Sequence, residues 1–180
     1  MAVWLALFRG INVGGKHIVP MKPLTELMTQ AGCSKVKSYI QSGNVVFQHD
    51  TADKTALSVM LSQLVAEHFG FCPKVMVLSA AEFSAITSQN PFLNQCDQGK
   101  NLHVFFLESA ATSADLAALA SFKQSGEQFH LTPHAFYLHA PEGIGRSKLV
   151  TKIDKCLGVA STARNLNTLE KLSELINQLS

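Results

Sequence analysis

The sequence predicts an α+β protein made of two similar halves, and three observations support this. Segments typical of strands and helices alternate through all 180 residues. The order strand, helix, strand, strand, helix, strand occurs twice along the chain. Each half also contains two β-rich runs joined by a short turn, which predicts a hairpin and therefore antiparallel strand pairs.

Apolar runs predict the strands of the first half, and apolar residues at helical spacing predict its helices. Gly32 ends the first helix, and Ser42-Gly43-Asn44 forms the turn of the hairpin. A capping box, Ser79 with Glu82, opens the last helix. The expected elements are strands at residues 3–9, 36–41, 45–48 and 74–78, and helices at 20–31, 53–69 and 79–88.

The second half repeats this order after a loop at residues 89–101, which contains Pro91 and Gly99. Thr112, with Asp115 behind it, is expected to cap the next helix, and Thr132-Pro133 turns the second hairpin. The expected elements are strands at residues 103–107, 127–131, 135–139 and 159–164, and helices at 112–121, 147–157 and 167–179.

This order predicts two tandem ferredoxin-like (β-α-β-β-α-β) plaits, each followed by a helix. The N-terminal subdomain is expected at residues 1–90 and the C-terminal one at 91–180. A doubly wound parallel sheet is the alternative, and the two hairpins argue against it. Apolar periodicity predicts these core residues: Leu5, Leu7, Leu27, Val46, Leu61, Leu64, Phe105, Leu107, Leu119, Leu138, Ile153 and Leu157.

Charge and cysteine content exclude several classes of protein. Residues 1–90 hold 7 basic and 5 acidic side chains, and residues 91–180 hold 8 of each, so a general nucleic-acid coat is disfavoured. The four cysteines form no CxxC pair and the seven histidines lack metal-ligand spacing, so we expect free thiols and no metal site. No apolar window reaches membrane-spanning length and no signal sequence is evident. We therefore expect a cytoplasmic protein without a membrane partner.

The first candidate site is the glycine-rich segment that follows the first strand. Glycine N–H groups and the cations Arg9 and Lys16 suit an anion. The segment from Gly10 to Lys16 also matches G-x-x-x-x-G-K, but His17 stands where Ser or Thr should hold Mg²⁺, and the next helix begins late. A P-loop is therefore disfavoured, and a flexible connector remains the structural alternative.

The first two strands of a plait run in the same direction, so this segment should lie beside the hairpin turn at residues 41–44. An ordinary hairpin tip is the alternative explanation for that turn. The predicted first site comprises Arg9, Gly10, Asn12, Gly14, Gly15, Lys16, Gln41, Ser42 and Asn44.

A second candidate site lies in the C-terminal half. Ser147 is expected to cap a helix whose free N–H groups point outward, and the last predicted strand ends at the same edge of the sheet. Turn glycines and solvated charges are the alternative, and Asn167 with Glu170 is interpreted as a helix cap. The predicted second site comprises Gly145, Arg146, Ser147, Lys148, Arg164 and Asn165.

These motifs carry a family resemblance. The segments ALFRGINVGGKHIVPM (residues 6–21), YIQSGNVVF (39–47), GIGRSKL (143–149) and TARNLNT (162–168) resemble the bacterial domain-of-unknown-function family 1697. The resemblance implies a compact bacterial protein of two ferredoxin-like parts, and it brings no assigned activity. His17 stands where that family often has Asn, and Leu166 where it often has an aromatic residue.

We therefore expect a protein that binds, or acts on, a phosphorylated or nucleotide-like small molecule. A single-stranded nucleic-acid module is a less favoured alternative, because it needs exposed aromatic residues on the sheet. A regulatory or assembly protein without a small ligand is the third. Glu108 is the only acid at a strand end, so the sequence identifies no catalytic residue and no cofactor, and it leaves enzyme activity and the oligomeric state open.

Overall fold

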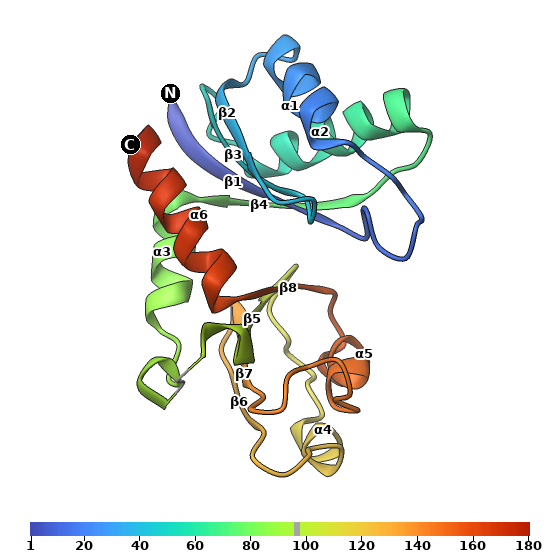
Figure 1. The fold of residues 1–180 in the computed structure, drawn as a ribbon, viewed down its shortest axis with the longest axis vertical. Coiled ribbons are helices and arrows are strands. Elements are labelled where there is room, and N and C mark those ends of the chain that lie inside the picture. Colours follow the sequence, from blue (N-terminus) through green and yellow to red (C-terminus); the bar gives the residue numbers. More distant parts are fainter. Residues whose placement is uncertain (96–97) are drawn as a thin grey trace. The chain divides into compact units, whose positions relative to one another are not determined.

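The computed structural model describes residues 1–95 and 98–180 and divides the chain into two compact units (Figure 1). Unit 1 consists of Met1–Ala85 and Lys171–Ser180, and unit 2 of Ile86–Glu170. This division differs from the predicted boundary at residue 90, because the C-terminal residues join unit 1. Gln48 Nε2 donates to Leu179 O at 2.8 Å, and Lys37 Nζ donates to Gln178 Oε1 at 3.0 Å.

Unit 1 is a four-stranded antiparallel sheet with the order β2-β3-β1-β4. Its elements are β1 (Ala2–Arg9), α1 (Met21–Gln30), β2 (Ser34–Tyr39), β3 (Asn44–His49), α2 (Lys54–Phe69) and β4 (Lys74–Ser79). Helix α3 (Ala80–Ser88) leads from unit 1 into unit 2, and α6 (Leu166–Leu179) returns.

Unit 2 has the same order of elements and the corresponding strand order, β6-β7-β5-β8, again antiparallel. Its elements are β5 (Leu102–Leu107), α4 (Leu116–Ser121), β6 (Gln128–Leu131), β7 (Ala135–His139), α5 (Ile153–Leu157) and β8 (Ser161–Asn165), with 3-10 turns η1 (Leu93–Gln95), η2 (Gly99–Asn101) and η3 (Val150–Lys152). The prediction of two α+β halves with hairpins is confirmed, and the parallel-sheet alternative is wrong for the described strands.

Two helix starts in unit 2 differ from the prediction. Helix α4 begins at Leu116, and its cap is Asp115, whose carboxylate accepts the Ala118 N–H at 2.8 Å, rather than Thr112. The helix predicted at residues 147–157 is shorter, because residues 150–152 form η3 and α5 begins only at Ile153. Hydrophobic spacing does not distinguish a 3-10 turn from the first turn of an α-helix.

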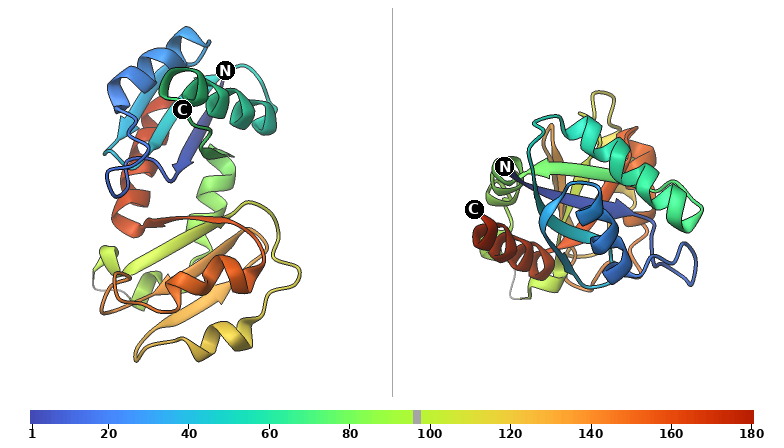
Figure 2. Two further views of the ribbon diagram at one scale, coloured as in Figure 1. Left: turned by 90° about the vertical axis from the view of Figure 1, so that its right-hand side faces the viewer. Right: turned by 90° about the horizontal axis from the view of Figure 1, so that it is seen from above.

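The central strands of the unit 1 sheet, β1 and β3, are buried on both faces. Helices α1 and α2 cover one face (Figure 2), where Trp4, Phe8 and Phe47 belong to the core. Leu5 and Leu7 point to the opposite face and are fully buried. Of the twelve predicted core residues, all are buried except Leu27 and Leu64, which are partly buried.

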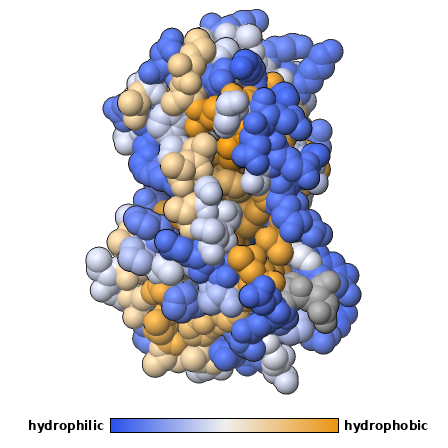
Figure 3. Space-filling view, turned by 90° about the vertical axis from the view of Figure 1, so that its left-hand side faces the viewer, coloured by the Kyte–Doolittle hydropathy of each residue, from blue (hydrophilic) through white to orange (hydrophobic). Residues whose placement is uncertain are grey.

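Figure 3 shows one face of the molecule, on which hydrophobic residues are exposed among hydrophilic ones.

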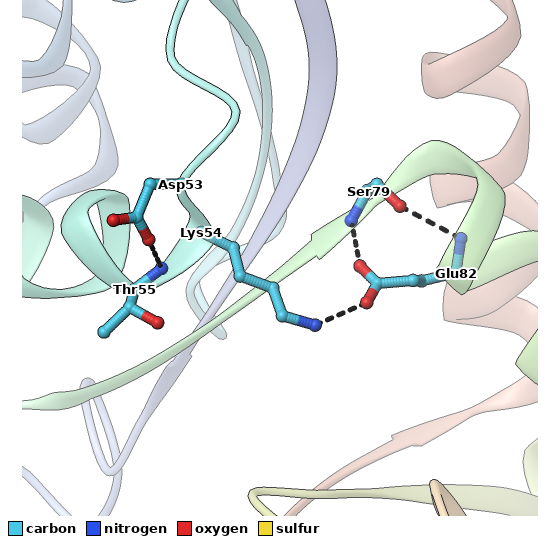
Figure 4. Close-up of polar contacts among 5 residues, drawn as sticks. All are labelled: Asp53, Lys54, Thr55, Ser79 and Glu82. Carbon is cyan, nitrogen blue, oxygen red and sulfur yellow. Dashed lines mark hydrogen bonds and ion pairs between the residues drawn. The ribbon is translucent and has the colours of Figure 1, made fainter.

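The predicted capping box at the start of α3 is present (Figure 4). The Ser79 N–H donates to Glu82 Oε2 at 2.9 Å, and the Glu82 N–H donates to Ser79 Oγ at 3.1 Å. Lys54, at the start of α2, donates to the other oxygen of Glu82 and forms an ion pair with it. Partial burial opposes ionisation of Glu82, but these contacts with Lys54 and Ser79 outweigh it and lower its pKa. The ion pair links α2 to α3.

Histidine 103, which the sequence places among apolar residues of a strand, is buried in β5. Burial lowers the pKa of its ring from 6.5 to about 4, although a hydrogen bond with the Asn101 backbone favours the charged form. The folded protein therefore holds a neutral imidazole at pH values where the unfolded chain binds a proton.

We expect unit 2 to lose stability as the pH falls from about 6.5 to about 4, because only the unfolded state takes up a proton at His103 over that range. The pKa difference between the unfolded and the folded state corresponds to a loss of roughly 3 kcal/mol in the free energy of unfolding. Urea denaturation at several pH values should show a shallower acid slope for His103→Gln than for the unchanged protein. The matched control is His130→Gln, an exposed histidine of β6. Equal slopes for the two variants would contradict the assignment to His103.

Candidate functional site

The β1–α1 loop, residues 10–20, is an ordered turn rather than a flexible connector. The Asn12 N–H donates to His17 O, and the Lys16 N–H donates to Val13 O, each at 3.1 Å. Gly14 and Gly15, which lie between Val13 and Lys16, have φ angles of +59° and +71°. Two central residues with positive φ are typical of a type I′ turn, which glycine adopts without strain. Turn geometry therefore explains this glycine pair.

The side chain of Asn12 fastens the loop at three points. Its Oδ1 accepts the Val19 N–H at 2.8 Å, and its Nδ2 donates to Val19 O at 2.9 Å and to Gln41 O at 2.8 Å. Both amide hydrogens are thus used within the protein. Asn12, predicted to contact a ligand, joins the two ends of the loop and connects them to the β2–β3 turn, residues 40–43.

The two predicted loops of unit 1 therefore lie together, as expected from the strand directions. The Phe8 N–H also donates to Gly43 O at 2.9 Å. A Cβ at Gly43, where φ is +76°, would lie 2.8 Å from Phe8 Cβ and from Ile11 Cδ1. Only glycine permits this close approach between the β2–β3 turn and the end of β1.

Asn44 has a structural position in the hairpin. Its side chain is fully buried, and its Nδ2 donates to Tyr39 O at 3.2 Å and to Ser42 Oγ at 2.8 Å. Ser42 is half-buried, whereas the Gln41 side chain is exposed. Of the polar side chains predicted in this turn, Gln41 is thus the most accessible to a ligand.

His17 and Phe71 support the other side of the β1–α1 loop. Their rings stack with centroids 4.3 Å apart, and His17 Nδ1 lies 3.2 Å from Gly10 O. Sequence reasoning missed Phe71, which lies 54 positions further along the chain. Only the tertiary fold brings the two rings together.

Two cations face each other at this end of the sheet. Arg9 is the last residue of β1, and its partner in the register of the β1–β4 pair is Lys74. Directly opposite residues share a face of the sheet, so two positive side chains are neighbours here. Lys16 is exposed in the adjacent loop. Sequence analysis did not identify Lys74, because the strand register is needed to find it.

The predicted second site has a different local structure from the one expected. Ser147 is buried, and its Oγ accepts the Val150 N–H at 3.3 Å, which closes the turn that precedes α5. Since α5 begins at Ile153, the expected helix N-terminus at Ser147 is wrong. Gly145, Arg146 and Lys148 are exposed.

The β8 residues of the second site also have structural contacts. Arg164 Nη1 donates to Ala163 O at 2.7 Å, and burial lowers the pKa of its guanidinium to about 10. Asn165 Oδ1 accepts the Thr168 N–H at 3.0 Å and so caps α6, the role that the sequence suggested for Asn167. Arg164 remains charged at neutral pH but is largely withdrawn from solvent.

Segment η2 contacts residues that flank the two parts of the second site. Asn101 O accepts the Ala140 N–H at 2.9 Å, and Asn101 Nδ2 donates to Pro141 O at 2.9 Å. A Cβ at Gly99 would lie 2.1 Å from Asn167 Oδ1. The loop after β7 and the start of α6 therefore lie at the same end of the unit 2 sheet, as predicted, with η2 against each.

Among the residues the structure describes, no group of three or more His, Cys, Asp or Glu side chains is arranged to hold a metal ion. Over the same residues, no helix combines the length and apolar character needed to cross a bilayer.

Comparison with known proteins identifies the family. Residues 1–137 match the model for "Protein of unknown function (DUF1697)", and the chain belongs to this family. A search of proteins with curated descriptions found no match. Among solved structures, the chain is similar to the conserved bacterial protein SP0830 from Streptococcus pneumoniae, with 26% sequence identity and a TM-score of 0.72. The similarity covers 97% of this chain and 98% of that one.

We expect Asn12→Gly to lower the free energy of unfolding by about 2 kcal/mol, because it removes three hydrogen bonds and retains a residue suited to the φ of +55°. Urea denaturation measures this loss, and hydrogen exchange should show reduced protection of the Val19 amide. Asn12→Ala should be less stable still, since alanine disfavours positive φ. A glycine variant as stable as the unchanged protein would show that the amide does not fasten the loop.

Proposed function

We propose that this member of the DUF1697 family binds a phosphorylated or nucleotide-like anionic small molecule at the loop end of unit 1. The observation that carries the proposal is the position of Arg9 directly opposite Lys74 in the sheet. Two cations that are neighbours on one face of the sheet can both contact the same phosphate group. Arginine can also grip a phosphate through two parallel hydrogen bonds.

The surroundings of this pair favour the same ligand class. Lys16 adds an exposed positive charge in a loop whose shape is already set by Asn12 and the Gly14-Gly15 turn. An ordered loop loses less conformational entropy on binding than a flexible one.

The aromatic side chains of the strands favour this function over single-stranded nucleic-acid binding. Phe47, Phe105 and Tyr137 are buried, and Tyr39 is half-buried. Base stacking requires exposed aromatic faces. The second predicted cluster, around Arg146 and Lys148, is proposed only as a secondary anion-binding patch, because the helix N-terminus that motivated it is not formed at Ser147.

We also propose that each unit is a ferredoxin-like plait. The repeated β-α-β-β-α-β order supports this, as does a sheet whose central strands are the first and third of each unit. Similarity to a bacterial protein supports a bacterial origin. The free thiols of Cys33, Cys72 and Cys156 support a reducing, cytoplasmic location.

The function is tested by thermal shift and calorimetry with pyrophosphate and a panel of nucleoside mono-, di- and triphosphates. We expect Arg9→Gln and Lys74→Gln each to weaken binding of the best compound by about tenfold or more, because each removes a charged hydrogen-bond donor. Arg9→Lys should weaken it less than Arg9→Gln but still measurably, since lysine cannot grip a phosphate with two parallel bonds.

A matched control is Lys155→Gln, an exposed lysine in α5 of unit 2, which should leave the affinity unchanged. Unchanged affinity in both Arg9→Gln and Lys74→Gln, or no binding of any panel compound, would refute the proposed function.

A further inference from the structure

Three exposed aliphatic residues lie in the two loops that the Asn12 amide joins. Val13 is 69% exposed, Ile18 57% and Ile40 53%, all far above the exposure of core residues. Each lies next to a residue that the amide holds: Val13 follows Asn12, Ile18 precedes Val19, and Ile40 precedes Gln41. The Asn12 amide therefore joins the two loops that carry these three exposed apolar side chains, and we call the three residues the aliphatic tip.

The backbone of Ile40 is strained as well as exposed. Its φ is +50°, in the left-handed region that β-branched residues rarely adopt. Such a conformation costs roughly 1–2 kcal/mol, and asparagine or glycine would avoid most of it. The side chain recovers little of this by burial, since about half of it is in solvent. Backbone strain of this kind concentrates at functional sites, and here it presents an isoleucine outward.

One positive charge adjoins the aliphatic tip. Lys16 pairs with Val13 across the Gly14-Gly15 turn, so an exposed cation lies directly beside an exposed aliphatic residue. A Cβ at Gly14 or Gly15 would meet no atom within 4 Å, so the end of the turn projects into open space. In Figure 1 this loop, in dark blue, extends beyond the end of the sheet.

We propose that the aliphatic tip docks onto the surface of a bilayer that contains acidic phospholipids. Val13, Ile18 and Ile40 would enter the boundary between headgroups and acyl chains, while Lys16 meets lipid phosphates. A soluble phosphate offers the aliphatic side chains nothing to contact, whereas a bilayer supplies negative charge and apolar material together. The absence of a spanning segment, which led us to expect no membrane partner, does not bear on peripheral docking.

This inference rests on the proposed function, because it identifies the bound anion as the phosphate of a lipid headgroup. The two are separated by comparing vesicles with soluble phosphates. We expect the full chain to sediment with vesicles of phosphatidylcholine mixed with phosphatidylglycerol, but not with vesicles of phosphatidylcholine alone. High salt should release the protein, since the attraction is partly electrostatic.

Variants test the apolar part separately. Val13→Ser and Ile40→Asn should each reduce vesicle binding by about fivefold or more, the effect of losing one partly buried aliphatic side chain. Neither should weaken binding of a soluble phosphate compound. Val59→Ser, which changes a valine of α2 that is 51% exposed, is the matched control and should bind vesicles normally. Lys16→Gln should weaken binding to vesicles.

Ile40→Asn supplies a second, independent measurement. Because asparagine tolerates positive φ, this variant should have a higher melting temperature than the unchanged protein while it binds vesicles less well. A lower melting temperature would show that Ile40 is needed for packing and would overturn the inference.

Two further outcomes would overturn it. If soluble phosphates bind but vesicles do not, the proposed function stands and the lipid surface is wrong, and an acidic protein partner for the aliphatic tip becomes the better explanation. If vesicles bind equally well after Val13→Ser and Ile40→Asn, the attachment is electrostatic adsorption without insertion. If neither vesicles nor soluble phosphates bind, both proposals fail.

Discussion

The loop end of unit 1 depends on the side-chain amide of Asn12. Its three hydrogen bonds close the β1–α1 loop at Val19 and attach it to the backbone of Gln41. Without these hydrogen bonds, the eleven-residue loop between Arg9 and α1, residues 10–20, would sample many conformations. Fixing the loop in one conformation costs conformational entropy, which the three hydrogen bonds offset. The amide thus turns two separate connections into one ordered surface. It does so from a residue with positive φ, a conformation that asparagine tolerates better than most residues.

The same surface combines features that a stable fold alone does not require. A strained, half-exposed isoleucine and two further exposed aliphatic residues each oppose stability. The rest of unit 1 contributes the stability that tolerates them, through a sheet whose central strands are buried on both faces and the capped helices α2 and α3. The concentration of unfavourable features at one end of the sheet is the reason for seeking function there.

Much of the fold could be predicted because local patterns and burial agree. Continuous apolar runs in β1 and β3 identify strands buried on both faces, and Ser79 with Glu82 marks a helix start that the structure has. The two candidate loops of unit 1 were also located correctly relative to each other, because the order of the elements implied that the first two strands run in the same direction. Individual side-chain roles could not be predicted in this way. Asn44 is buried, Ser147 closes a turn, and Asn165 caps α6, although the sequence suggested all three as ligand contacts.

By itself, the sequence determined the order of the elements, the two hairpins and most core positions. These depend on contacts between near neighbours in the chain and on the periodicity of apolar residues. Only the tertiary structure decided that Lys74 faces Arg9, that Phe71 stacks on His17, and that residues 171–180 complete unit 1. Each of these joins residues more than fifty positions apart, and such contacts are set by strand register and packing, which no local pattern records.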